Sequence, residues 1–375
     1  MTSRLDSPIA VLAATALLYG GFLYLHLANA TWNPTVLVMA GKPVVEPDSL
    51  PAGFAILAGQ AGYDGQYYYR LALDPLTDRP IAHGIRLDLP AYRQQRILYP
   101  VLARVLARGQ DELIPWTLIA VNFIALLALG WLGGLYAIQL GVPAIWGLAF
   151  PLYIGFVTSL SRDLAEPVEC ALILGALLCV RRHRYWIAAL LLSAAVLAKE
   201  PALLVAVGIA LADLFTSRGR FSQRTRYVAA LPVVVLAAWQ FWLWRNWGTV
   251  GVIEGSANAG GPFSGITMAL SGGLWHWHWP WGLALLVVVV TGVVCLFTLR
   301  GSRSTAAERA AAALYALLLI SLSGNVWGDN HAFVRAASEF SLLAAILLLG
   351  SRAVWPRWIL LTGSIAWLGA ASQVM

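Results

Sequence analysis

The chain has 375 residues, of which 59% are hydrophobic and 11% are charged, well below the roughly 25% charged residues of soluble domains. The net charge of +7 does not indicate nucleic-acid binding, because the arginines fall in short loops between apolar runs, where they set membrane orientation. The composition excludes a soluble domain and predicts an all-α, polytopic membrane protein, with residues 1–375 forming a single membrane-embedded domain in contact with membrane lipids.

Apolar runs of about 20 residues, the length that crosses a bilayer, recur along the chain. The first follows Arg4 and ends in Ala28-Asn29-Ala30, which is also typical of a signal peptide, but the run is longer than the usual apolar region of about 7–15 residues. We therefore expect an uncleaved first span. About eleven spans are predicted, near residues 8–29, 114–138, 143–160, 164–180, 185–198, 201–216, 227–245, 274–299, 306–323, 333–350 and 355–371.

The run ILYPVLARVLA at residues 97–107 is short and contains Pro100 and Arg104. Segments of about 10 to 14 apolar residues are typically re-entrant or interfacial. If this run does not span and the N-terminus is cytoplasmic, the arginine-rich loops face the cytoplasm, as the positive-inside rule requires. We therefore expect residues 30–113 to form one long extracytoplasmic loop with interfacial or re-entrant helices, in a membrane of the bacterial inner (plasma) type. The cytoplasmic loops then carry Arg181, Arg182, Arg184, Arg218, Arg220, Arg224, Arg226, Arg300, Arg303, Arg309, Arg352 and Arg357.

The stretch GYDGQYYYRLALDP, residues 62–75, is unusually polar and aromatic for this chain and belongs to the predicted outer loop. Asp64 precedes Gly65, which tolerates a tight turn, and a segment with good helix potential follows. Backbone N–H groups at a helix N-terminus favour an anion. Both an ordinary helix N-cap and a catalytic carboxylate are compatible with this position.

A second polar stretch, SRDLAEP at residues 161–167, ends in a proline that suits the first turn of a helix. Asp163, Glu166 and Glu169 are three residues apart and are expected to form one stripe, while Arg162 and Glu166 are expected to form an i,i+4 pair. Ionisable groups that enter a membrane span are costly, so they indicate function by default. A self-neutralising pair that holds two spans together is the structural alternative.

Two further polar groups come to the same predicted side of the membrane. Lys199 ends a short span in the sequence AKEP, and GDNHAFVR carries His331 and Arg335 one helical turn apart. Arg335 and Glu339 are again four residues apart. Cationic groups here could clamp a phosphate, although snorkelling side chains that anchor a helix end are also compatible with the pattern.

Two other features are less informative. The sequence LWHWHWPW at residues 274–281 has two histidines spaced i,i+2, as metal ligands can be, but a tryptophan-rich interfacial belt explains it better. Residues 246–273 contain Gly-Gly-Pro and are expected to form a flexible outer loop that could act as a lid. The cysteines lie inside apolar runs, so neither a disulfide framework nor a metal cluster is expected; they are Cys170, Cys179 and Cys295.

Three features together resemble the GT-C glycosyltransferases. They are a long first outer loop with Asp64 at its rim, the half-helix RILYPVLARVLA and the polar turn TSLSRDLAEPVECALILGALLC. These are multi-span enzymes that use polyprenyl-phosphate-linked sugars. The polar turn looks like a region of the GPI mannosyltransferase catalytic subunit, and YDGQYYYRLALDP looks like that of bacterial proteins of cell-surface glycopolymer formation. The likeness covers residues 8–215, a GT-C-like module, whereas residues 216–375 match in general layout as variable C-terminal helices.

The resemblance implies inverting transfer of a sugar from a polyprenyl-phosphate donor to an extracytoplasmic glycan, lipid or protein in cell-envelope assembly. It implies that Asp64 is the general base. The family often has two adjacent acids there, but the neighbour here is Gly65, so any second acid is Asp163 or Glu166. No metal or other cofactor is expected, because the lipid phosphate is already a good leaving group. The expected phosphate ligands are Arg335, Lys199, Arg162 and His331, and the expected sugar or acceptor contacts are Tyr63, Gln66, Tyr67 and Tyr68, although the tyrosines could equally be interface anchors.

Two other classes of protein stay open at this stage. A transporter or flippase for lipid-linked sugars would usually place its ionisable groups near mid-membrane on broken helices, whereas these lie at the predicted outer rim. A non-catalytic scaffold subunit of an envelope assembly is the third alternative.

Overall fold

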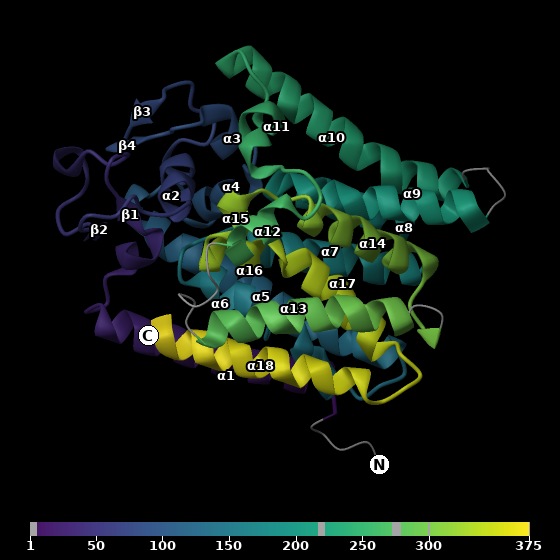
Figure 1. The fold of residues 1–375 in the computed structure, drawn as a ribbon. Helices are drawn as coiled ribbons and strands as arrows, with labels where there is room; N and C mark the ends of the chain where they lie inside the picture. Colours follow the sequence, from purple (N-terminus) through teal and green to yellow (C-terminus); the bar gives the residue numbers. More distant parts are fainter. Residues whose placement is uncertain (1–5, 217–221, 272–278, 299–300, 375) are drawn as a thin grey trace.

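The computed structural model describes residues 6–216, 222–271, 279–298 and 301–374, and these form a mainly helical chain (Figure 1). High apolar content with few internal breaks favours helices, which satisfy their own backbone hydrogen bonds in a bilayer. The helices are α1 (Pro8–Asn29), α2 (Gly65–Leu73), α3 (Pro90–Gln94), α4 (Leu98–Leu106), α5 (Ile114–Gln139), α6 (Ile154–Leu160), α7 (Glu166–Arg181), α8 (Tyr185–Ala198), α9 (Leu203–Thr216), α10 (Gln223–Trp247), α11 (Gly251–Glu254), α12 (Ser264–Ser271), α13 (Trp279–Thr298), α14 (Ala306–Ile320), α15 (Gly324–Trp327), α16 (Asn330–Ala336), α17 (Ser338–Leu349) and α18 (Pro356–Val374).

Four segments among the described residues are helical, long and apolar enough to cross a membrane: Pro8–Asn29, Asp111–Gln139, Thr225–Trp247 and Trp281–Thr298. The protein is therefore an α-helical membrane protein. Five other apolar helices, α7, α8, α9, α14 and α17, have 12 to 16 residues. At 1.5 Å per residue they are about 18 to 24 Å long, shorter than a hydrocarbon core of about 30 Å. The eleven spans stay a prediction.

Two of the predicted spans are interrupted. Residues 143–160 form the 3-10 helix η4 (Ala144–Ala149) and then α6, with Pro151 between them. A proline has no backbone N–H to donate to the helical hydrogen-bond ladder, which is consistent with a break at this position. Residues 333–350 are divided between α16 and α17 at Ala337.

Residues 30–113 form a layer of short elements at one end of the long helices, at the left of Figure 1. We call this end of the molecule the loop end. The helix α4 has nine residues, about 14 Å, and is too short to cross a bilayer. The layer also contains the 3-10 helices η1 (Pro34–Val38), η2 (Pro47–Ser49) and η3 (Asp111–Leu113), the parallel pair β1 (Ala40–Gly41) and β2 (Ile56–Leu57), and the antiparallel pair β3 (Ile81–Ala82) and β4 (Ile85–Arg86). The remaining 3-10 helices are η5 (Glu200–Ala202) and η6 (Gly255–Asn258).

A separate hydrophobic core joins this layer to the long helices. Tyr68 of α2 packs edge-to-face against Tyr99 of α4, with ring centroids 5.3 Å apart, and both pack with Leu118 of α5 and Leu164. Such buried aromatic contacts hold short elements that could not be stable alone. They fix the N-terminal end of α2, and with it Asp64, over the start of α7.

The first and last helices are joined directly. The indole N–H of Trp367 in α18 donates to the hydroxyl of Tyr19 in α1 at 2.9 Å, and that hydroxyl donates to the carbonyl of Pro151 at 2.5 Å. Both aromatic side chains are nearly fully buried. Two polar groups in an apolar interior thus satisfy each other and tie three distant parts of the chain together.

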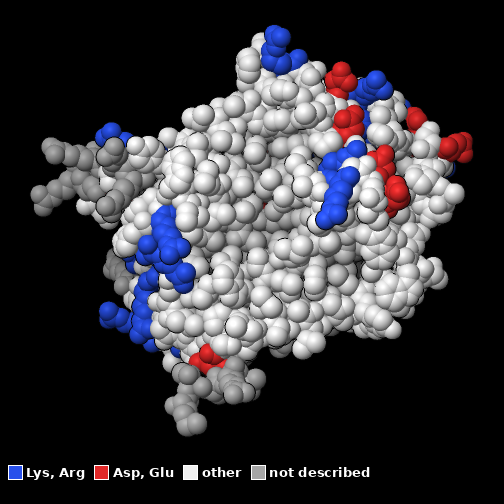
Figure 2. Space-filling model, turned by 180° about the vertical axis from the view of Figure 1, so that it is seen from behind, with Lys and Arg blue, Asp and Glu red and all other residues white. Residues whose placement is uncertain are grey.

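Charged side chains mostly gather at two opposite sides of the face in Figure 2, and a broad surface without charged side chains lies between them. At the end opposite the loop end, Arg181 binds both carboxylate oxygens of Glu308, at 2.6 and 2.7 Å. Glu308 also completes a capping box with Thr305 at the start of α14. An uncharged band between two charged ends is what a protein surface in contact with lipid needs.

Candidate active site

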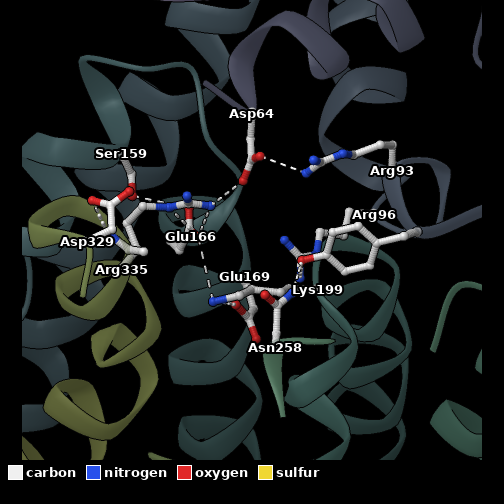
Figure 3. Close-up of polar contacts among 12 residues, drawn as sticks. Asp64, Arg93, Arg96, Ser159, Glu166, Glu169, Lys199, Asn258, Asp329 and Arg335 are labelled. Carbon is white, nitrogen blue, oxygen red and sulfur yellow. Dashed lines mark hydrogen bonds and ion pairs between the residues drawn. The ribbon is translucent and has the colours of Figure 1, made fainter. Parts of the chain in front are cut away.

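Charged side chains from four distant stretches meet at the loop end (Figure 3). Asp64 directly precedes α2, Glu166 begins α7, Lys199 directly follows α8, and Arg335 lies in α16. Nη2 of Arg335 is 3.0 Å from Oδ2 of Asp64 and 3.0 Å from Oε1 of Glu166. One guanidinium thus bridges two carboxylates, an arrangement that suits its planar fork of donors.

Lys199 extends this network into the bundle. Its Nζ lies 2.5 Å from Oε1 of Glu339, 3.6 Å from Oε1 of Glu166 and 3.8 Å from Oε2 of Glu169. Burial alone lowers the pKa of Lys199, but the three carboxylates, Glu339 first, outweigh burial and hold the pKa above its ordinary value. Lys199 is therefore a neutralised structural cation in this arrangement.

Arg93 is a site residue that sequence reasoning missed. Its Nη1 is 2.8 Å from Oδ1 of Asp64, its Nε is 2.8 Å from Oδ1 of Asp88, and its guanidinium lies 4.0 Å from the ring centroid of Tyr67. A signal was available in PAYRQQR, where a proline begins a helix and two arginines, Arg93 and Arg96, are three residues apart.

Arg96, also missed, links the site to the segment after α10. It binds both oxygens of Glu200, at 3.0 and 3.1 Å, and donates to the hydroxyl of Tyr92 at 3.2 Å. Asn258 donates to the same hydroxyl at 2.9 Å, and Glu254 accepts from the Tyr92 backbone N–H at 3.0 Å. The predicted lid region, residues 246–273, thus contacts the site through one tyrosine.

Asp64 occupies the N-cap position of α2, but its side chain makes no capping hydrogen bond. Its two oxygens bind Arg93 and Arg335 instead. Burial on its own raises the pKa of this carboxyl, whereas the charges of Arg93 and then Arg335 outweigh burial and hold the pKa below its ordinary value. Asp64 is therefore ionised at neutral pH and is free of the simpler capping role.

Gly65 explains why a second acid does not follow Asp64. A Cβ at residue 65 would lie 2.3 Å from the carbonyl oxygen of Arg162 and 2.8 Å from that of Val38. Real Cβ atoms do not approach backbone atoms so closely, so this residue must be glycine for α2 to pack against the turn before α7.

The two predicted i,i+4 pairs are wrong. Glu166 binds Arg335 rather than Arg162, and its other oxygen accepts from Ser159 at 3.1 Å. Glu339 binds Lys199 rather than Arg335. Each predicted pair straddles a helix boundary, because α7 begins at Glu166 and a break separates α16 from α17. The i,i+4 geometry requires a continuous helix.

Asp163 does not belong to the predicted stripe on α7. It lies in the turn before the helix, in a left-handed conformation with φ of 49°, which is costly for a residue other than glycine. Its side chain is fully buried and neither oxygen has a hydrogen-bond partner among the described residues. Burial raises the pKa of Asp163 well above its ordinary value, which favours the protonated form of this carboxyl.

Arg162 differs from the other cations of the site because no described carboxylate lies within 4.0 Å of it. Its Nη1 donates to the Ser161 hydroxyl at 2.8 Å, its Nη2 lies 3.0 Å from Nε2 of His331, and its Nε has no partner among the described residues. The ring of Tyr63 lies beside both guanidinium groups, 5.6 Å from that of Arg162 and 5.0 Å from that of Arg335.

The protonation states of this pair follow from their surroundings. Burial lowers the pKa of Arg162 to about 10, which leaves it charged at neutral pH. Burial, and then the charge of Arg162, lower the pKa of His331 to about 3, which leaves the imidazole neutral. Because a guanidinium only donates, Nε2 of His331 accepts and its proton is on Nδ1. That Nδ1 is buried without a partner among the described residues. An N–H of His331 without an acceptor therefore lies beside the Arg162 guanidinium, which has no carboxylate partner among those residues.

A small cleft of about 190 Å³ opens at Asp64, lined by Asp64, Tyr67, Tyr68, Tyr92, Arg93 and Arg96. Two of the predicted sugar contacts, Tyr67 and Tyr68, are part of this lining. The predicted contact Gln66 does not line the cleft. Its side chain accepts a hydrogen bond from the Gly41 N–H at 3.1 Å and donates one to the Ala61 carbonyl at 3.3 Å. Its side chain therefore fixes the loop behind α2.

No group of three or more His, Cys, Asp or Glu side chains among the described residues is placed to hold a metal ion. Metal-independent chemistry stays a prediction. The two histidines of the tryptophan-rich segment, His276 and His278, lie outside the described residues.

The fold and this site define an α-helical membrane protein with a buried charged network that opens into a cleft at one end of its helices. Searches with family models, among curated proteins and among solved structures found no match to the chain.

Proposed function

We propose that the chain is an integral membrane glycosyltransferase, which moves a sugar from a polyprenyl-phosphate donor to an acceptor hydroxyl with inversion. The observation that carries this proposal is an ionised Asp64 at a cleft, in contact with the buried cation Arg335. A base and several cations at one end of apolar helices suit a substrate whose reactive phosphate lies at the membrane surface. The positive-inside pattern favours an extracytoplasmic position for this end, and we propose that the reaction serves the assembly of envelope glycans or glycolipids.

In the proposed reaction, Asp64 accepts the proton of the acceptor hydroxyl while that oxygen forms a bond to the anomeric carbon of the sugar. The bond between the anomeric carbon and the phosphate oxygen breaks, and its electron pair leaves with the lipid phosphate. Attack from the face opposite the leaving group inverts the anomeric configuration. Asp64 ends neutral and the phosphate gains the negative charge, so total charge is conserved.

The resting pKa of Asp64 is low for a base, because two guanidinium groups stabilise its ionised form. Donor binding is expected to change this, since a phosphate near Arg335 opposes the attraction that lowers the pKa. The pKa of Asp64 should rise when the donor binds and rise further as the leaving phosphate gains charge. Proton acceptance and departure of the phosphate then support each other.

Arg162 and His331 are the best candidates for receiving the phosphate. Arg335 and Lys199 already bind carboxylates, whereas no described carboxylate binds Arg162. Nε of Arg162 and Nδ1 of His331 are buried and have no hydrogen-bond partner in the described part of the chain, which costs free energy until an anion satisfies them. Arg335 then acts mainly by positioning Asp64.

The position of the site favours this enzyme over a transporter or flippase. Transporters usually hold their substrates near the bilayer midplane. Asp64, Arg93 and Arg335 instead lie at the loop end, outside the four segments long enough to span. The cleft is small, so substrates require movement of the lining side chains or of the residues 251–258 that contact Tyr92.

The test is transfer from a radiolabelled polyprenyl-phosphate sugar by the purified, reconstituted chain and its Asp64→Asn variant. We expect a loss of about 10²- to 10⁴-fold in the transfer rate, the usual contribution of a general base, with donor binding retained. The matched control is Asp78→Asn, an exposed acid of the same loop, which should transfer at the normal rate. Full transfer by Asp64→Asn would reject this carboxylate as the base.

A further inference from the structure

A second cavity in the loop layer has no part in the site described above. It is an open groove of about 1180 Å³ that lies where the chain leaves α1 and where it enters α5, and it shares no lining residue with the cleft at Asp64. Its floor is ordered: Asn33 donates to the Gly53 carbonyl at 2.8 Å and accepts from the Thr35 hydroxyl at 2.7 Å. The groove is therefore a preformed feature of the loop end.

The polar lining of the groove is acidic. It includes three carboxylates, Asp48, Asp111 and Glu112, and contains no lysine or arginine. Asp111 binds Arg104 of α4, which puts one cation at the rim. Asp48 and Glu112 make no ion pair with any described residue. Two unpaired carboxylates on the wall of one groove favour a cationic ligand.

Tyr69 supplies an independent sign of a ligand. Its side chain lines the groove at 3% exposure, with its ring 5.0 Å from that of Phe54. Its hydroxyl makes no hydrogen bond with a described residue and stays accessible from the groove, so a ligand in the groove can bind it. Burial, and then Asp111, raise the pKa of Tyr69 to about 12, so the hydroxyl remains a donor at neutral pH. A ligand with an acceptor oxygen could therefore accept a hydrogen bond from this hydroxyl.

The groove lies at the depth of the membrane surface. Asn33 follows the span Pro8–Asn29 by four positions, and Asp111 begins the span Asp111–Gln139. Trp32 and Trp116, one residue from groove residues, are 51% and 40% exposed, and exposed tryptophans at the ends of spans are typical of the headgroup region. A ligand in this groove can therefore be part of a lipid.

We propose that this groove binds the headgroup of an aminophospholipid from the adjacent leaflet. Its ammonium group pairs with Asp48 and Glu112, and its phosphate accepts hydrogen bonds from Arg104 and the Tyr69 hydroxyl. The apolar residues of the lining, among them Leu50 and Leu73, contact the glycerol and the first methylene groups. This proposal does not depend on glycosyl transfer, because the groove and the Asp64 site are separate.

The test is native mass spectrometry of the detergent-purified full chain, titrated with phosphatidylethanolamine and, separately, with phosphatidylglycerol of the same acyl chains. We expect phosphatidylethanolamine to bind about 10-fold more tightly, the scale of one charge-assisted contact. The double variant Asp48→Asn/Glu112→Gln should lose this preference, and Tyr69→Phe should weaken binding of both lipids by a smaller factor. Asp64→Asn should bind like the unmodified chain.

Two further arms sharpen the result. Glu46→Gln, an exposed acid of the same loop outside the groove, is the matched control and should keep the preference. Displacement of the lipid by soluble phosphoethanolamine would support recognition of the headgroup itself. Equal binding of the two lipids by the unmodified chain, or an unchanged preference in the double variant, would overturn the proposal. Thermal unfolding of each variant checks that the substitutions leave the fold intact.

Discussion

Replacing Arg335 by glutamine should destabilise the protein strongly, and the structure gives the size of the effect. The guanidinium contacts Asp64 and Glu166 at 3.0 Å, and the side chains of Arg335 and Glu166 are 9% and 2% exposed. Without the Arg335 guanidinium, the nearest cation to Glu166 is Lys199 at 3.6 Å, while Asp64 keeps its ion pair with Arg93. Removing one partner of such a buried pair costs about 3–5 kcal/mol, mostly because the other charge remains buried.

The matched control is Arg93→Gln. Arg93 makes as many ion pairs, but the side chains of its partners Asp64 and Asp88 are 24% and 38% exposed. Water can solvate both carboxylates, so we expect a loss of about 1 kcal/mol or less. The assay is equilibrium unfolding in detergent, followed by circular dichroism.

A second substitution separates charge from packing. Arg335→Gln/Glu166→Gln removes the stranded carboxylate as well, so it should be more stable than Arg335→Gln by most of the lost free energy. If the double variant is no more stable than the single one, or if Arg335→Gln unfolds like Arg93→Gln, the ion pair does not act in the way argued here.

Three other predictions follow from the site. Gly65→Ala should lower the unfolding free energy by about 1–3 kcal/mol, because its Cβ would overlap the Arg162 carbonyl; a normal melting temperature would contradict this. Arg162→Gln should weaken donor binding about 10- to 100-fold by calorimetry while leaving stability equal or higher, since an unpaired buried charge is removed; unchanged donor affinity would count against a phosphate there. His331 has a folded pKa of about 3 against about 6.5 when unfolded, so the unfolded state binds more protons between these values and stability should fall as pH is lowered through that window. Melting curves from pH 7.5 to 5.0 should show a shallower fall for His331→Asn, and equal slopes would refute the assignment.

The sequence predicts which residues meet at the site better than it predicts their contacts. Apolar run length and the distribution of arginines are properties of the chain alone, so they lead Asp64, Lys199 and Arg335 to one predicted side, where the structure has them together. Partner choice depends on where helices begin and end. Breaks before Glu166 and at Ala337 redirect both predicted pairs to other helices.

Other features could not be read from local patterns. Arg93 and Arg96 have a local signal in PAYRQQR, but their contacts with Asp64 and Glu200 depend on tertiary packing that this segment does not encode. The unmatched state of Arg162 is likewise a result of packing, since Glu166 is four residues away in sequence but binds elsewhere. Gly65, by contrast, is a residue that the sequence already singled out as the neighbour of Asp64. The structure explains why it is glycine, because a Cβ there would overlap the Arg162 carbonyl.

The hydrogen bond between Trp367 and Tyr19 has a consequence for how the protein is made. Its two partners are 348 residues apart, so the amino-terminal helix enters the membrane long before its closing contact has been translated. Until then, a polar hydroxyl on that helix has no indole to bind. A chain that stops before Trp367 should insert but lack this contact between its first helix and the rest of the protein, so we expect it to be cleaved faster by an added protease than the full chain.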